Sequence, residues 1–312
     1  MVAENTENDT LTDDIIFISG GYDHTIRFWD ALAGVCTRVI QLPESHVNAL
    51  AITKDKKLLA VAGNPHVKVF EIASEKSNPI HVFDGHSGNV VSTGFQKDSK
   101  WLYTGSDDGT IRLWDIRTPR CQRHYSNPSP INSVVLHPNQ GELVSCDQNG
   151  SFKVWDLGGN VCSHELLPEE NVAARSVTIS GDGNTLVGAT NSGNCYIWKY
   201  SAGSFVPHDS VQAHERYITK CLLSPNGKRL ATASAEKTAK IWEMEELKLE
   251  QTLTGHTEWV WDCAFTADSA YIITASSDMV PRLWDISTGE TMRFYSAHQK
   301  AVTSIALNDL SF

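Results

Sequence analysis

The stretch that decides the fold is residues 85–115, which read GHSGNVVSTGFQKDSKWLYTGSDDGTIRLWD. Short runs of alternating apolar residues are separated there by Gly, Asp and Ser, as in consecutive antiparallel strands joined by turns. A second copy, GHTEWVWDCAFTADSAYIITASSDMVPRLWD, occupies residues 255–285. The two copies predict a repeated meander of short strands.

The aromatic residue that closes this unit recurs along the whole chain. It appears at intervals of 41 to 44 residues, at Trp29, Phe70, Trp114, Trp155, Trp198, Trp242 and Trp284. A period of about 40 to 45 residues that ends in a Trp-Asp-like pair is typical of four-stranded propeller blades. The chain resembles the WD-repeat family over nearly its whole length, which predicts an all-β fold made of one seven-bladed β-propeller.

The WD-repeat resemblance also implies a buried hydrogen-bonded set of one His, one Ser or Thr, one acidic residue and the Trp. A buried indole N–H and imidazole need hydrogen-bond partners, and such a set supplies them. Three continuous units hold it: His86, Thr104, Asp108 and Trp114; His214, Thr232, Glu236 and Trp242; His256, Thr274, Asp278 and Trp284. The units that carry Phe70, Trp155 and Trp198 lack members of the set. In the unit of Trp198, Glu170 stands at the position that the His holds in complete units. Their folding is expected to depend on packing.

Two fragments of the same set lie at opposite ends of the chain. His298 has no Trp after it, whereas Ser19, Asp23 and Trp29 have no His before them. Joined, the fragments make one complete set. We therefore expect residues 301–307 to form the inner strand of a seventh blade whose other three strands come from the first 40 residues. Pairing the two ends removes exposed sheet edges.

Composition indicates a single soluble domain. The chain has 312 residues, 41% of them hydrophobic and 20% charged, without an apolar run of membrane-spanning length. Residues 1–14 are polar and acidic and lack the features of a secretory signal, so a disordered tail is expected before a propeller over residues 15–312. The seven cysteines include no Cys-x-x-Cys pair and fit reduced thiols in the cytoplasm. A net charge of −11 disfavours binding to nucleic acid or anionic lipid.

No sequence motif for catalysis is found. The chain has no Gly-x-Ser-x-Gly elbow, no phosphate-binding Gly-rich loop followed by Lys-Ser/Thr, and no His-Glu-x-x-His pair. Four of the twelve histidines belong to the expected sets and the others lack ligand spacing, so neither a metal nor another cofactor is expected. We therefore expect a binding protein that is not an enzyme. A propeller enzyme or small-ligand protein that uses the central channel is the weaker alternative.

Large aromatic residues are expected to gather on one face of the disc. In each meander, the start of the inner strand and the turn between the second and third strands lie at the same end. Positions equivalent to Trp261 hold polar residues in five of the other six blades, which indicates a solvent-facing column. Six residues should form one arc across four consecutive blades, here named the aromatic arc: Tyr217, Trp259, Trp261, Tyr22, His46 and Asn48.

Exposed clusters of Trp and Tyr beside polar rims are typical of protein-binding hot spots. The aromatic arc is therefore interpreted as a partner-binding surface. The alternative is that Trp259 and Trp261 fold into the channel mouth as packing, which their parity with Cys263 and Phe265 supports.

Several stretches outside the generic repeat pattern resemble one branch of the family, the small WD-repeat subunits of TOR kinase complexes. Examples are GYDHTIRFWDALAGVCTR (21–38), NSGNCYIW (191–198), WVWDCAF (259–265) and HQKAVTSIALND (298–309). The resemblance implies a non-catalytic scaffold that docks on an insertion in the C-terminal lobe of the TOR kinase domain. It would stabilise the kinase, help to frame the active-site cleft and contact other subunits of the complex.

The same resemblance implies a docking face that includes His46, Asn48, Trp259 and Trp261. His46 departs from the family pattern, because an uncharged amide is usual at that position. The implied location is cytoplasmic, or peripheral on endomembranes through the kinase complex.

A further alternative comes from Trp114-Asp115-Ile116-Arg117, which resembles a box found in substrate receptors of cullin-type ubiquitin ligases. A single box is weak evidence, because an Arg after a Trp-Asp pair often faces solvent. A receptor or general scaffold role stays open at this point, and co-purification with the ligase adaptor would indicate it.

Overall fold

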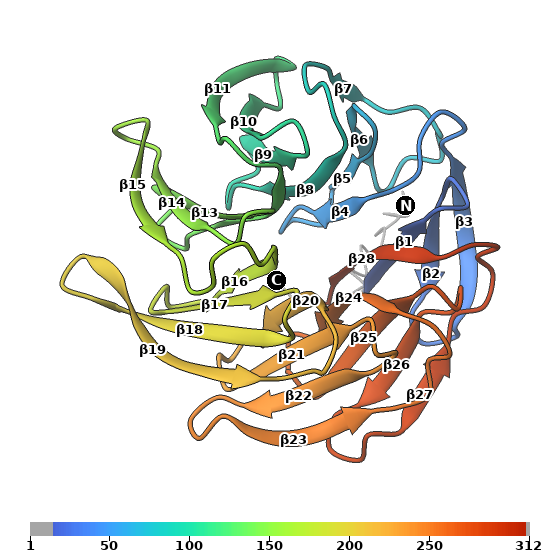
Figure 1. Ribbon diagram of the computed structural model, residues 1–312. Helices are drawn as coiled ribbons and strands as arrows, with labels where there is room; N and C mark the ends of the chain where they lie inside the picture. The colour runs from blue at the N-terminus through green and yellow to red at the C-terminus, as the bar shows by residue number, and fades with distance from the viewer. Residues whose placement is uncertain (1–14, 310–312) are drawn as a thin grey trace, which may run out of the picture.

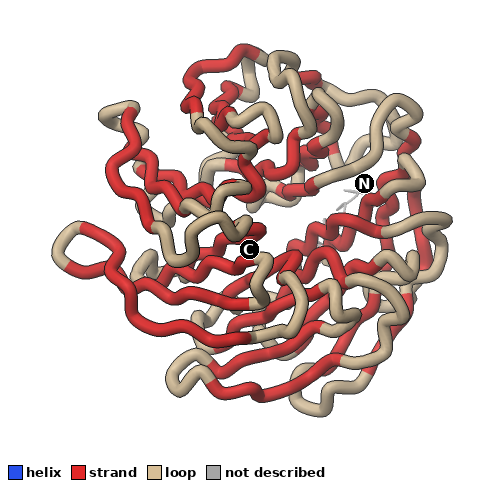
Figure 2. Tube along the Cα trace, in the orientation of Figure 1, coloured by secondary structure: helices blue, strands red, loops and turns tan. Residues whose placement is uncertain are grey.

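The computed structural model describes residues 15–309, which form seven four-stranded antiparallel sheets arranged as a ring of blades (Figure 1). These residues contain no helix, and loops and turns join the strands (Figure 2). The predicted all-β, seven-bladed propeller is confirmed. The tail predicted over residues 1–14 lies outside the described residues.

Six blades use four consecutive strands each, ordered from the central channel outward. Blade 1 contains β4 (Ala49–Ile52), β5 (Leu58–Ala62), β6 (Val67–Glu71) and β7 (His81–Phe83), and blade 2 contains β8 (Val90–Phe95), β9 (Trp101–Ser106), β10 (Thr110–Asp115) and β11 (Arg120–Ser126). Blade 3 contains β12 (Ile131–Leu136), β13 (Glu142–Asp147), β14 (Phe152–Asp156) and β15 (Val161–Leu166), and blade 4 contains β16 (Ala174–Ile179), β17 (Thr185–Thr190), β18 (Asn194–Ser201) and β19 (Ser204–Gln212). Blade 5 contains β20 (Ile218–Leu223), β21 (Arg229–Ser234), β22 (Ala239–Glu243) and β23 (Lys248–Leu253), and blade 6 contains β24 (Val260–Phe265), β25 (Tyr271–Ser276), β26 (Arg282–Asp285) and β27 (Thr291–Phe294).

Blade 7 joins the two ends of the chain. Its strand order is β28 (Val302–Asn308), β1 (Ile16–Gly21), β2 (Thr25–Asp30) and β3 (Val35–Gln41). β28 and β1 are antiparallel, with Phe17 opposite Leu307 and Ile18 opposite Ala306. The predicted closure is confirmed, with the inner strand displaced by one residue from the expected range.

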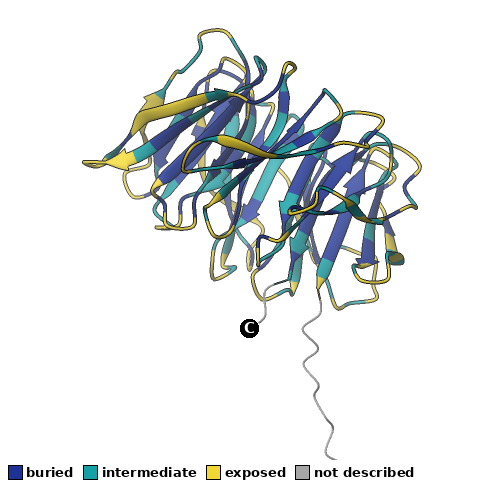
Figure 3. Ribbon diagram, turned by 90° about the horizontal axis from the view of Figure 1, so that it is seen from below, coloured by how far each residue is buried: buried dark blue, intermediate teal, exposed yellow. Residues whose placement is uncertain are grey.

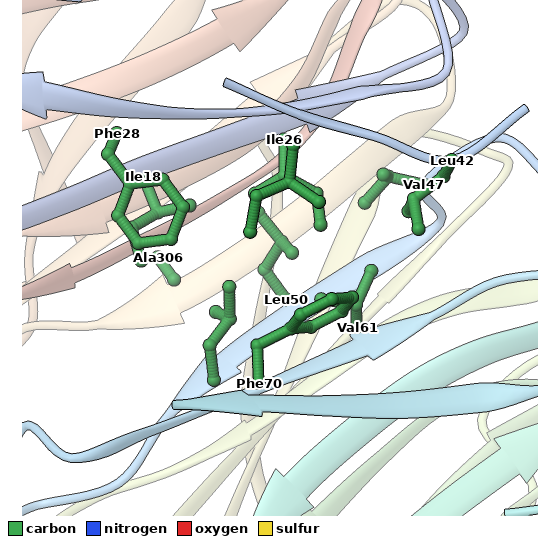
Figure 4. Close-up of a cluster of buried hydrophobic side chains, with 11 residues drawn as sticks. Ile18, Ile26, Phe28, Leu42, Val47, Leu50, Val61, Phe70 and Ala306 are labelled. Atoms are coloured by element: carbon green, nitrogen blue, oxygen red, sulfur yellow. The ribbon is translucent and has the colours of Figure 1, made fainter. Parts of the chain in front are cut away.

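The hydrophobic core lies between neighbouring blades. At the interface of blades 7 and 1, Ile18, Ile26 and Phe28 pack on Leu50 and Phe70 (Figure 4). Seven clusters of this kind fill the seven interfaces, and each Å² of buried apolar surface contributes about 25 cal/mol. Exposed residues lie mainly on outer strands and turns (Figure 3). The ring therefore holds together by packing of sheet on sheet.

Turns between second and third strands require special backbone conformations. Gly109 follows Asp108 in blade 2 with a φ of 77°, in the left-handed region that favours glycine. A side chain there would meet the carbonyl oxygen of Asn127 at 2.6 Å. This close approach fixes the turn that presents Asp108 to its histidine.

Candidate protein-binding face

The hydrogen-bonded set in blade 2 links two strands and a turn. His86 Nε2 lies 2.7 Å from Thr104 Oγ1, and Trp114 Nε1 donates to the same hydroxyl at 2.9 Å. His86 Nδ1 lies 2.9 Å from Asp108 Oδ2. All four side chains expected in this set are therefore brought together.

Blades 5 and 6 contain the same arrangement. His214 lies 2.8 Å from Thr232 Oγ1 and 2.6 Å from Glu236, and Trp242 donates to Thr232 at 3.2 Å. The glutamate thus reaches the position that an aspartate holds elsewhere. In blade 6, the corresponding contacts are His256 to Thr274 at 2.7 Å, His256 to Asp278 at 2.8 Å, and Trp284 to Thr274 at 2.8 Å.

The fourth set crosses the closure of the ring. His298, which precedes β28, lies 2.7 Å from Ser19 Oγ and 2.8 Å from Asp23 Oδ2. Trp29 Nε1 donates to Ser19 Oγ at 2.7 Å. One serine therefore connects the C-terminal histidine with the N-terminal tryptophan.

Burial and hydrogen bonding set the protonation of these groups. Burial raises the pKa of Asp108, but hydrogen bonds from Thr110 and His86 outweigh it and bring the value to about 2. The pKa of Glu236 likewise falls to about 2, because bonds to His214 and Lys240 exceed the effect of burial. Burial lowers the pKa of His86 more than Asp108 raises it. The acids are therefore charged and the histidine is neutral at neutral pH.

Blades 3 and 4 contain polar connections that the sequence did not predict. In blade 3, Asn127 Nδ2 donates to Asp147 at 2.9 Å, and Trp155 donates to Ser145 at 2.8 Å. In blade 4, Glu169 accepts hydrogen bonds from three side chains, those of Thr190, Ser192 and Asn194. Glu169 therefore accepts these bonds in the blade where Glu170 was expected in register with the His, and such polar contacts add to the packing on which blades 3 and 4 were expected to depend.

The polar column expected to face solvent also joins neighbouring blades. Asn48 Nδ2 donates to the Val90 carbonyl of the next blade at 3.0 Å. Three further residues of the column are half-buried and make the equivalent bond: Asn132 to Ala174, Thr219 to Val260, and Thr303 to Val47. These four side chains also line the central cavity, so their polarity both faces the channel and satisfies backbone carbonyls.

Trp261 occupies this column in blade 6 and behaves differently. Its single N–H donates to Ser277 Oγ of the same blade at 2.6 Å. Asp262 instead makes the connection to blade 7, where its carboxylate accepts from the Ile305 N–H at 3.0 Å and Ser304 Oγ at 3.2 Å. Sequence reasoning missed this role for Asp262.

Asp262 also contacts the preceding blade. Its Oδ1 lies 3.4 Å from Lys220 Nζ of blade 5, and this carboxylate, acting against burial, raises the pKa of Lys220. A signal for this ion pair was present in the sequence. Asp262 and Lys220 occupy equivalent positions of consecutive repeats, and the other repeats hold small residues there: Ala49, Ser92, Ser133, Ser176 and Ser304. Opposite charges at equivalent positions of neighbouring blades indicate an ion pair between them.

The aromatic arc consists of two groups of touching rings. Tyr217 packs edge-on against Trp259, with centroids 5.2 Å apart, and Trp259 lies 5.5 Å from Trp261. Tyr22 and His46 lie 5.0 Å apart. All six residues of the arc, Asn48 included, line one cavity of about 680 Å³ at the central channel.

Exposure in the arc is intermediate. Tyr22 is 41% exposed, and Tyr217, Trp259, Trp261 and His46 are half-buried. The tryptophans therefore combine packing at the channel mouth with access from outside. Burial is the largest cause that lowers the pKa of His46, and electrostatic interaction with neighbouring His24 lowers it further. The imidazole is thus uncharged at neutral pH.

The other half of this face is polar. Its side chains pair within blades 2, 3 and 4: Asn89 with Asp107 at 3.0 Å, Asn132 with Gln148 at 3.3 Å, and Arg175 with Asn191 at 2.9 Å. Within residues 15–309, no group of three His, Cys, Asp or Glu side chains is placed to hold a metal ion. The same part of the chain forms no helix that is long and apolar enough to cross a membrane.

The repeated blades and their hydrogen-bonded sets define a WD-repeat propeller. The model of the WD domain, G-beta repeat, matches residues 9–30, 77–115, 119–156, 205–243 and 247–285.

Full-length relatives specify the branch. The chain is 55% identical over 301 residues to target of rapamycin complex subunit wat1 of Schizosaccharomyces pombe, with 95% of this chain and 96% of the relative covered. It is 51% identical to target of rapamycin complex subunit LST8 of Saccharomyces cerevisiae, with 95% and 99% covered. It is 44% identical to the LST8 subunit of Bos taurus, with 98% of both chains covered. The chain belongs to the LST8 family of WD-repeat proteins.

Proposed function

We propose that this chain is a non-catalytic subunit of TOR kinase complexes that uses no cofactor. It docks through the aromatic arc on the insertion in the C-terminal lobe of the kinase domain, stabilises the kinase and helps to frame its active-site cleft. The names of the full-length relatives support membership in such a complex. The subunit works in the cytoplasm and reaches endomembranes only through the kinase complex.

The gathering of the arc around one cavity supports this docking surface. Half-buried Trp and Tyr rings present apolar area at little entropic cost, because their neighbours already hold them. A subunit of this kind acts by binding energy alone. It favours one conformation of the kinase to the extent that it binds that conformation more tightly.

The test is affinity purification of wild type and of the Trp259→Ala/Trp261→Ala variant from the native cell. Partners are identified by mass spectrometry, and a thermal melt of each protein checks folding. Asn89→Ala/Gln148→Ala, on the polar half of the same face, is the matched control. Loss of a TOR-type kinase from the tryptophan variant alone, at an unchanged melting temperature, supports the proposal.

Other outcomes point elsewhere. Retention of the kinase by a folded tryptophan variant would move the interface away from the arc. Recovery of a cullin-ligase adaptor with wild type, in place of a kinase, would support the receptor function instead.

A further inference from the structure

A groove runs between blades 2 and 3 on the face opposite the aromatic arc. It begins at Lys100 and Trp101, where β9 starts, and passes Asp115, where β10 ends. The arc lies at the other ends of the strands, where the inner strands begin. The groove has a volume of about 560 Å³, and turns of blade 3 that contain Gly141 and Leu157 form its far wall.

The groove is cationic although the chain is acidic. Four of the chain's eleven arginines fall within residues 112–123, against a net charge of −11. Lys100, Arg117 and Arg123 line the groove, and Arg120 is exposed beside it on β11. Positive charge therefore concentrates at one place on the rim.

Nearby carboxylates neutralise only part of this charge. Asp115 Oδ2 lies 3.0 Å from Arg117 Nη2, and Asp98 Oδ2 lies 3.9 Å from Lys100 Nζ. Among the described residues, Arg120 and Arg123 form no salt bridge. Arg117 remains open to solvent, with 82% of its side chain exposed. Arg120 and Arg123 are therefore the cations of this region that no carboxylate holds, although Arg123 also donates to the Leu157 carbonyl.

Protection of a sheet edge accounts for only part of the arrangement. Outer strands often carry charges that prevent edge-to-edge pairing, and β3 and β27 do so with one arginine each. β11 holds two arginines and a histidine, which is more positive charge than those strands carry. Arg123 also turns into the groove, where it hydrogen-bonds the Leu157 carbonyl of blade 3.

The floor of the groove is apolar. Trp101 is partly exposed and lies beside Leu113 and Leu157. Cations around an apolar floor fit a chain segment that alternates carboxylates with apolar side chains, because charge-assisted hydrogen bonds and burial then act together.

We propose that this groove, here named the basic groove, binds an extended acidic segment of a partner protein. Carboxylates of the segment contact Arg117, Arg120 and Arg123, and an apolar side chain packs on Trp101. The site is separate from the proposed kinase-docking face, so the chain can hold two partners at once.

The probe is a fluorescein-labelled peptide in which glutamate alternates with leucine, measured by fluorescence anisotropy with the full chain. Its counterpart carries glutamine in place of glutamate. We expect the glutamate peptide to bind more tightly, and to weaken as salt screens the arginines. Arg117→Glu/Arg123→Glu should reduce its affinity at least about tenfold, as the loss and reversal of two partly exposed charge contacts requires.

Matched variants separate the groove from general charge effects. Lys54→Glu/Lys57→Glu makes the same charge change at exposed positions of blade 1 and should alter affinity less than about twofold. Trp101→Ala should weaken binding at low and high salt alike, because its contribution is apolar. Arg117→Gln/Arg123→Gln repeats the test if the glutamate variant melts at a lower temperature.

Three results would overturn the proposal: equal binding of the glutamine peptide, equal loss in the lysine variant, or unchanged affinity in Trp101→Ala. The kinase-docking proposal fails independently. The arginine variant should keep the kinase, and the Trp259→Ala/Trp261→Ala variant should keep the peptide.

Discussion

Asp262 accepts a hydrogen bond from the backbone N–H of Ile305 at 3.0 Å, across the junction of blades 6 and 7. This junction has Trp261 at the position where Asn48, Thr219 and Thr303 tie other blades together. The neighbouring carboxylate therefore provides the link that the indole does not, and the tryptophan side chain is left at the channel mouth.

Replacement of Asp262 by alanine should destabilise the ring. The Ile305 N–H and Ser304 hydroxyl would lose their shared acceptor, and Lys220 would lose its counter-ion. We expect the free energy of unfolding to fall by about 2 to 3 kcal/mol, since buried donors without partners cost about 1 to 3 kcal/mol each. Urea denaturation measures the change. Glu258→Ala, which removes a carboxylate that is 54% exposed, is the control, and equal midpoints for both variants would contradict the assignment.

Trp261→Thr should separate stability from binding. Threonine at this column donates to the next blade in blades 5 and 7, so the variant should fold with a wild-type melting temperature. Kinase binding should weaken by about 2 kcal/mol or more, the usual loss at a hot spot. Pull-down titration with a thermal melt gives both quantities. Val91→Thr makes a similar change in blade 2 and should keep binding, while a Trp261→Thr protein that binds normally would support packing as the role of the indole.

Ser19→Ala should destabilise the protein more than Ser145→Ala. Ser19 Oγ bonds both His298 and Trp29, whereas Ser145 Oγ bonds Trp155. Each buried partner left without a bond costs about 1 to 3 kcal/mol, so the effect at blade 7 should be about double. Thermal denaturation compares the two variants. A larger effect of Ser145→Ala would show that the closure is not held by this serine.

Acid should destabilise the propeller in two ranges. The lowered pKa of His86, His214 and His256 means that unfolded histidines bind protons that the folded state excludes. Their contribution is full above about pH 6.5 and declines as the pH falls below it. Asp108 and Glu236, with pKa values of about 2, contribute fully above about pH 4.5 and lose that contribution as the pH approaches 2. Unfolding midpoints measured from pH 8 to pH 3 test this, and Glu236→Gln should flatten the lower range.

The sequence predicted the hydrogen-bonded sets and the closure because each requires particular side chains at fixed intervals. No Trp follows His298 and no His precedes Trp29, and only a closed ring joins these two fragments into one set. The contacts made by the column that contains Asn48 and Trp261 were harder to predict. The sequence of a single repeat does not show whether a polar side chain faces water or bonds the next blade. Glu169 was missed in favour of Glu170 for a related reason. Both glutamates lie in the loop between β15 and β16, and the hydrogen bonds from Thr190, Ser192 and Asn194 identify Glu169 as the one that turns inward.

Closure through β28 makes the proposed docking surface dependent on the integrity of the ring. The N–H of Tyr22 bonds the carbonyl of Ala301 at 2.9 Å, and Thr303 bonds Val47 next to His46. Two residues of the proposed docking surface, Tyr22 and His46, therefore lie on or beside backbone that is bonded to β28 or to the residue that precedes it. Separation of β28 from its neighbours would remove these bonds and loosen this half of the surface, while Tyr217 and Trp259 keep their contact with each other.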